Sequence, residues 1–114
     1  INCADEIGER NCDVPLERII RWNPDVIFIW GNATYGPDYI INNPQWRHIN
    51  AVKNRRVFWF PDWNTWSPRV AVVTLWMAMK IYPEIYSDVS FNSITDRFMR
   101  DVFGIPYKRM EQVE

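Results

Sequence analysis

The spacing of apolar residues in the first part of the chain predicts a short helix followed by a strand. Leu16, Ile19 and Ile20 recur at helical spacing within residues 14–22, and Asn23-Pro24 ends this helix, because a residue before proline avoids the helical region. The following run DVIFIW, at residues 25–30, is rich in β-branched and aromatic side chains. Such a run is typical of a buried strand in a parallel sheet.

The segment between this strand and the next is expected to be mostly loop and short helix. It contains a loop at 31–37, a helical turn at 38–42, a short helix at 44–52 with Asn43 as its cap, and a basic turn at 53–56. Residues 56–60 then form the second predicted buried strand.

The second half of the chain predicts two longer helices. Residues 68–82 form the longer, with Ser67 as N-cap, Pro68 at the first helical position and Pro83 as its stop. Only Thr74 and Lys80 are polar between Val70 and Tyr82, so this helix is expected to be buried within a larger body.

The last predicted helix, residues 90–103, is amphipathic. Phe91, Ile94, Phe98 and Val102 form its apolar stripe, Gly104 is the expected C-terminal cap, and residues 105–114 are expected to be a tail.

Strands that alternate with helices predict an α/β fold with a small, mainly parallel sheet flanked by helices. Two secure strands are few for a chain of 114 residues in which 47% are hydrophobic. We therefore interpret residues 1–114 as a single lobe of a larger protein whose other lobe is absent. Ile1 is not an initiator methionine, which fits a processed or excised piece.

The charge and residue counts narrow the classes of partner. The net charge of −1, from 13 basic and 14 acidic residues, gives no basic excess for nucleic acid. No apolar run reaches the roughly 18–20 residues that span a membrane.

Cys3 and Cys12 either form a disulfide, as in an oxidising compartment, or remain free thiols. His48 is the only histidine and is interpreted as a surface or packing residue, so no cofactor and no protein-bound metal are predicted.

The candidate binding residues follow the two predicted strands. The second strand leads into an aromatic loop with Asp62, Trp63 and Trp66 and then to Arg69 at a helix start, and Trp30, Asn32 and Tyr35 follow the first strand. Parallel sheets bind ligands at the carboxyl ends of their strands. Tryptophan rings stack on flat groups, and a helix N-terminus with an arginine suits an anion, although Arg69 equally suits a structural pair with an acid such as Asp62.

Two segments resemble one known family. Residues 15–29, PLERIIRWNPDVIFI, are similar to a signature of class III solute-binding proteins of ABC importers, which capture ferric siderophores, haem and cobalamin. Residues 46–84 contain AVKNRRVF, then WSPR, then the helix ending IYPE, similar in order and spacing to the C-terminal lobe of the same proteins. The resemblance covers roughly residues 11–105 and implies a three-layer, Rossmann-like lobe.

The resemblance also implies roles for particular residues. Glu17 matches the glutamate that docks into arginines of the permease, and Asp62 and Trp63 match an Asp-Trp pair that contacts cobalamin in relatives. It implies a periplasmic or extracellular location, free or lipid-anchored, with ABC permease subunits as partners and contact with the membrane only through a tether or the permease. The expected ligand is a chelated metal, such as a ferric siderophore or haem, or an anion; cobalamin and an oxyanion stay open.

Two other functions remain as alternatives. In the first alternative, the lobe is a surface module that binds a protein or glycan without transport. In the second, it is a small α/β enzyme that uses Ser67 with His48. Ser67 lacks the glycines of a nucleophile elbow, and its capping role already accounts for it. A binding protein without catalysis is therefore the leading interpretation.

Overall fold

The computed structural model describes residues 7–8, 13–60 and 67–107. The chain divides into two compact units, Ile1–Trp59 and Phe60–Glu114, and each is described by itself.

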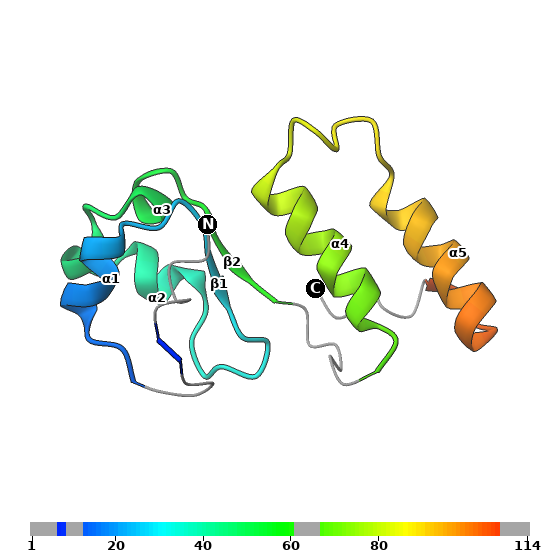
Figure 1. Cartoon of the computed structure of the whole chain (residues 1–114), viewed down its shortest axis with the longest axis horizontal. Helices are drawn as coiled ribbons and strands as arrows, with labels where there is room; N and C mark the ends of the chain where they lie inside the picture. The colour runs from blue at the N-terminus through cyan, green and yellow to red at the C-terminus, as the bar shows by residue number, and fades with distance from the viewer. Residues whose placement is uncertain (1–6, 9–12, 61–66, 108–114) are drawn as a thin grey trace. The chain divides into compact units, whose positions relative to one another are not determined.

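The first unit is built around a two-stranded parallel sheet (Figure 1). Strand β1 (Ile27–Ile29) pairs with β2 (Val57–Trp59) in a register that places Ile27 opposite Val57 and Ile29 opposite Trp59. The helical elements of this unit are α1 (Leu16–Trp22), α2 (Pro37–Ile41), the 3-10 helix η2 (Pro44–Trp46) and α3 (Asn50–Lys53). The predicted α/β class, with a small parallel sheet flanked by helices, is confirmed.

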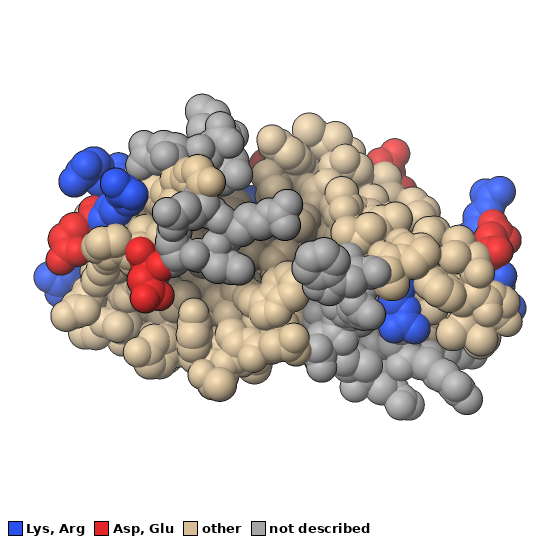
Figure 2. Space-filling view, turned by 60° about the horizontal axis from the view of Figure 1, so that its bottom comes forward, with Lys and Arg blue, Asp and Glu red and all other residues tan. Residues whose placement is uncertain are grey.

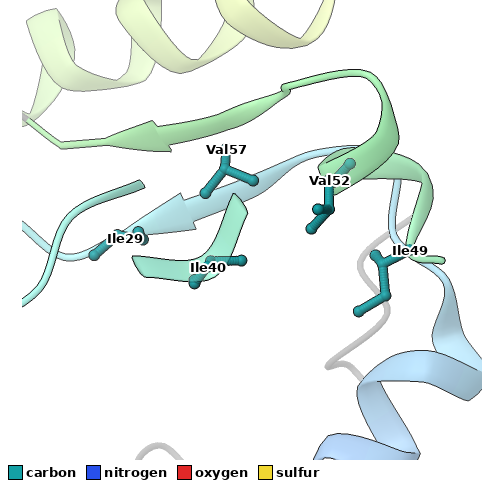
Figure 3. Packing of buried hydrophobic residues seen from close by; sticks show 6 residues of the cluster. Ile29, Ile40, Ile49, Val52 and Val57 are labelled. Carbon is teal, nitrogen blue, oxygen red and sulfur yellow. The ribbon is translucent and has the colours of Figure 1, made fainter. Parts of the chain in front are cut away.

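The apolar core of the first unit joins the sheet to α2 and α3. Its buried residues are Ile29, Ile40, Ile49, Ala51, Val52 and Val57. Figure 3 shows Ile29 and Val57 on the two strands, near Ile40 of α2 and Val52 of α3. The half-buried side chains Leu16 and Ile19 pack α1 against this core. The two strands therefore share one apolar core with α1, α2 and α3.

The predicted helix at 44–52 is interrupted at Ile49. Asn43 is a cap as expected, because its Oδ1 accepts the Gln45 N–H at 3.0 Å. Ile49, however, has extended backbone angles (φ −74°, ψ 133°) and only 1% of it is exposed. Burial of this side chain in the core takes precedence over a continuous helix, so the segment forms two short helical pieces.

The Asn23-Pro24-Asp25 segment ties β1 to the start of α3. Asn23 caps the C-terminus of α1 in the left-handed region (φ 47°), and its Oδ1 accepts the Asn50 N–H at 2.9 Å. The Pro24 carbonyl accepts the Ala51 N–H at 2.9 Å, and Asp25 Oδ1 accepts from Asn50 Nδ2 at 3.1 Å. The first N–H groups of a helix have no partner within it. In α3, those of Asn50 and Ala51 donate instead to acceptors that lie 27 residues earlier in the chain.

The second unit contains a pair of helices that pack side by side (Figure 1). Helix α4 spans Val70–Ile81 and α5 spans Phe91–Phe103. Val72 and Val73 of α4, Met99 of α5 and Tyr107 form their buried core. Within the described residues, most other apolar side chains of α4 are only half-buried, and Val70 is exposed.

The ends of these helices follow the sequence closely, with one difference at the start of α4. Ser90 caps α5 by accepting the Ser93 N–H at 3.3 Å, and Gly104 ends it with φ 67°. Helix α4 begins at Val70 rather than Pro68, because residues 67–69 form a turn in which Ser67 Oγ accepts the Arg69 N–H at 3.3 Å.

Two predictions about the end of the chain were wrong. The buried face of α5 is centred on Thr95 and Met99, so Ile94 and Val102 of the predicted stripe are 45% and 48% exposed. Residues 105–107 are not a tail: Tyr107 is 3% exposed, and its N–H donates to Asp96 Oδ1 at 3.0 Å. Packing of this aromatic ring against the helix pair holds the segment in place. Residues 108–114 lie outside the described part of the chain.

Charges of both signs share the surface. Figure 2 shows Lys and Arg side chains in small groups near Asp and Glu, without a broad field of one sign on the face drawn. None of the described helices combines the length and apolar character needed to cross a membrane.

Thr95→Val is expected to stabilise the second unit by about 1 kcal/mol, because an unpartnered buried hydroxyl costs that much or more. Thr95 is fully buried, and among the residues that the structure describes its Oγ1 has no hydrogen-bond partner. Thr74→Val is the matched control, since the exposed Thr74 Oγ1 donates to the Val70 carbonyl at 2.8 Å. Urea unfolding measures both, and a destabilised Thr95→Val variant would contradict the expectation.

Candidate functional site

The three candidate residues that follow β1 lie in one loop. This loop begins with a turn in which the Ala33 N–H donates to the Trp30 carbonyl at 2.9 Å. Trp30, Asn32 and Tyr35 are all exposed. The structure therefore places them together beyond the carboxyl end of β1, as the sequence predicted, and their contact with a ligand stays a prediction.

Trp59, the last residue of β2, joins this loop. Its Nε1–H donates to the Trp30 carbonyl at 3.1 Å. Its ring also lies over Gly36, where an added Cβ would meet Cε3 and Cζ3 at 3.1 Å. Sequence reasoning missed Trp59 because it stands inside a continuous apolar run. The available signal was its position next to the last residue of the predicted strand at 56–60.

Exposed aromatic side chains gather where the two strands end. Trp30 is 51% exposed, Tyr35 45%, Tyr39 64% and Trp59 47%. The Tyr35 and Tyr39 rings lie 5.3 Å apart between centroids, at 42° to one another. We call these four side chains the aromatic edge. Because parallel sheets bind ligands at the carboxyl ends of their strands, this surface is suited to the flat or apolar part of a small molecule.

Arg69 belongs to the second unit and has an aromatic partner there. Its guanidinium carbon lies 5.5 Å from the centroid of the Phe103 ring, within the range of a cation–π interaction. The residue precedes α4 and is half-buried. This contact adds a structural role that the sequence did not predict, whereas anion binding by Arg69 stays a prediction. Asp62, Trp63 and Trp66, as well as Cys3 and Cys12, lie outside the described residues.

Glu17 lies in the first turn of α1 and is exposed. Ile20 and Arg21, three and four residues later, share its face of the helix and are exposed too. The helix is held by Leu16 and Ile19, which pack against the core on its other side. Glu17 is therefore free to meet another protein, and docking stays a prediction.

The remaining candidate residues have local roles. His48 is exposed, and its Nε2 accepts a hydrogen bond from Arg47 Nε at 3.1 Å. Ser67 Oγ accepts the Arg69 N–H within the turn that precedes α4, so Ser67 is not the N-cap that the sequence predicted; Arg69 holds that position. Among residues 7–8, 13–60 and 67–107, no three His, Cys, Asp or Glu side chains are grouped so that they could hold a metal ion.

Comparison with known proteins assigns the chain to a family. A family model described as periplasmic binding protein matches residues 1–62, more than half of the chain. The chain belongs to the periplasmic binding protein family. This family consists of binding proteins rather than enzymes.

Three relatives illustrate the likeness. The molybdate-binding protein MolA of Haemophilus influenzae is 28% identical over 100 residues, which cover 83% of this chain and 28% of MolA. A crystal structure of Helicobacter pylori CeuE in complex with Ni-His is 32% identical with a TM-score of 0.80, over 88% of this chain and 33% of CeuE. A periplasmic solute-binding protein of Veillonella parvula, 22% identical with a TM-score of 0.81 over 97% of this chain and 36% of its own, shows the shared fold alone.

The molybdate-bound structure of MolA also resembles the chain, with a TM-score of 0.67 and 27% identity over 82% of this chain and 30% of MolA. The chain thus spans between 28% and 36% of the length of these relatives.

Proposed function

We propose that the chain is the C-terminal lobe of a two-lobed extracytoplasmic receptor that captures a small solute and delivers it to an ABC permease. The family assignment and the order of the two sequence signatures support this role. The observation that carries it is the aromatic edge at the carboxyl ends of β1 and β2. In this function the lobe binds its ligand without catalysis and without a resident cofactor, on the outer side of the membrane, with or without a lipid anchor.

The proposed ligand is a chelated metal with a flat organic part, such as a ferric siderophore or haem. Relatives have been crystallised with Ni-His and with molybdate, so both chelated metals and oxyanions are held by this family. The aromatic edge favours the chelate, because exposed rings gain most by covering an apolar or conjugated surface. A bare oxyanion gains nothing from these ring faces and needs hydrogen-bond donors instead. Arg69, Asp62, Trp63 and Trp66 remain predicted ligand contacts.

The test is a tryptophan-fluorescence titration of the protein in its two-lobed form. The panel contains ferric siderophores, haem, cobalamin, Ni-His and molybdate, with Trp30→Ala and Tyr35→Ala variants. We expect saturable quenching by a chelate and about tenfold weaker binding in each variant, since an aromatic contact and its buried area together contribute about 1.4 kcal/mol. Tyr82→Ala is the control, because Tyr82 is 54% exposed at the end of α4. Equal affinity in all variants would remove the aromatic edge from the site.

Replacing Glu17 by Arg tests delivery separately from capture. If Glu17 docks with basic residues of a permease, reversing its charge replaces attraction by repulsion, and like-charge contacts at an interface are strongly unfavourable. We expect transport to be lost while ligand affinity is unchanged. Glu84→Arg, at another exposed acid, should leave both intact. Uptake of labelled ligand by cells measures the first quantity and equilibrium titration the second; undiminished uptake by Glu17→Arg would exclude docking through this residue.

A further inference from the structure

Trp59 is held on two sides by the loop that follows β1. Its Nε1–H donates to the Trp30 carbonyl at 3.1 Å, and its ring carbons lie over Gly36. Its strand neighbour Ile29, directly opposite in the parallel register, is only 4% exposed. The backbone of Trp59 is thus anchored at the core, and its indole is fixed at both the nitrogen and the benzo ring.

Despite these contacts, 47% of Trp59 remains exposed. Much of Trp59 is therefore not covered by the core. Here the ring is fixed while much of its surface stays open, beside the exposed Trp30 and Tyr35 of the same loop. A ring fixed before binding loses little side-chain entropy when a ligand covers it, so more of the contact energy appears as affinity.

Gly36 determines how closely the indole approaches the loop. Its φ of −109° is open to any residue, so glycine is not required by the backbone conformation. It is favoured instead by space, because a Cβ would come within 3.1 Å of two Trp59 ring carbons. Gly36 therefore acts as the support on which the indole rests.

We propose that Trp59, supported by Gly36 and oriented by the Trp30 carbonyl, is a stacking platform for a flat conjugated ring of the ligand. The proposal rests on the proposed receptor function and adds the residue that selects for ligands with such a ring. Aromatic faces attract one another in offset or tilted stacks, and a tetrahedral oxyanion has no such face to offer. Trp59 therefore distinguishes between a chelate with an aromatic or macrocyclic part and a simple anion.

The experiment compares flat and non-flat probes on the two-lobed protein. Ferric 2,3-dihydroxybenzoate and haem are the flat probes, and molybdate is the probe without a ring. We expect Trp59→Ala to weaken binding of a flat probe about tenfold and Trp59→Phe about threefold, because phenylalanine keeps a ring but loses the anchoring N–H. Gly36→Ala should weaken the same probe severalfold by displacing the indole, while urea unfolding shows the fold intact. Tyr82→Ala should bind like the wild type.

The possible results separate this proposal from the function on which it rests. Binding of a flat probe with equal affinity in wild type and Trp59→Ala overturns the platform and leaves the receptor function in place. Binding of molybdate alone has the same meaning. If the wild-type protein binds none of the three probes, the platform is overturned. If it also binds none of the chelates and anions in the fluorescence titration above, the receptor function is overturned as well.

Discussion

Replacing Ile49 by alanine is expected to lower the free energy of unfolding by about 3 kcal/mol, within the 2–5 kcal/mol typical of such core truncations. Ile49 is 1% exposed and belongs to the core that joins the sheet to α2 and α3. Its extended backbone, just before α3, aims the side chain into that core. The smaller side chain would leave a cavity in this core, and the cost of such a cavity adds to the lost burial of the removed methyl and methylene groups.

Urea unfolding followed by far-ultraviolet circular dichroism measures this loss. Ile20→Ala is the matched control, because Ile20 is 44% exposed on α1 and a surface change of this kind alters stability by no more than about 0.5 kcal/mol. Similar stabilities for Ile49→Ala and Ile20→Ala would show that Ile49 does not organise the first unit.

The second large effect is expected at Asn23. Its Oδ1 accepts the Asn50 N–H, and a lost cap of this kind costs about 1 kcal/mol. Its backbone is left-handed, with φ 47°, a conformation that costs a residue such as alanine roughly a further 1 kcal/mol. Asn23→Ala should therefore destabilise the chain by about 2 kcal/mol in urea unfolding, as the sum of these two effects.

Two further substitutions at this position separate the contributions. Asn23→Gly relieves the backbone but removes the cap, so about half of the loss should remain; Asn23→Asp keeps an acceptor oxygen and should lose least. Asn42→Ala is the control, since Asn42 also ends a helix but does so in the right-handed region, with φ −87°. An Asn23→Ala variant as stable as Asn42→Ala would mean that the link to Asn50 contributes nothing.

Local sequence signals predicted most of the fold. Proline after Asn23 and Tyr82, the Ser90 cap and Gly104 act within one helical turn, and the structure shows the corresponding helix ends at or beside these positions. The two apolar runs likewise became paired strands, although each is only three residues long. The interruption at Ile49 was not predicted, because it follows from burial of this side chain in a core that is built from segments distant in sequence.

The candidate site was predicted only in part. Trp30, Asn32 and Tyr35 were found because they directly follow a recognisable strand. Trp59 and Tyr39 were missed, because an apolar residue in a strand or short helix is ordinarily assigned to the core. Similarly, no pattern in the sequence indicates that Arg69 lies against Phe103, 34 residues later by their numbers.

The sequence by itself determined the α/β class, the helix ends at Asn23, Tyr82, Ser90 and Gly104, and the family, because these depend on short-range sterics and on motifs that are contiguous in the chain. The tertiary structure decided which apolar residues are covered and which are exposed. Ile49 is buried just before the start of α3, which the Asn23 link holds, and the Gly36 contact fixes the Trp59 indole while 47% of Trp59 stays exposed. Burial and exposure depend on neighbours that the chain supplies only once it has folded, and the proposed ligand platform depends on the part of Trp59 that stays exposed.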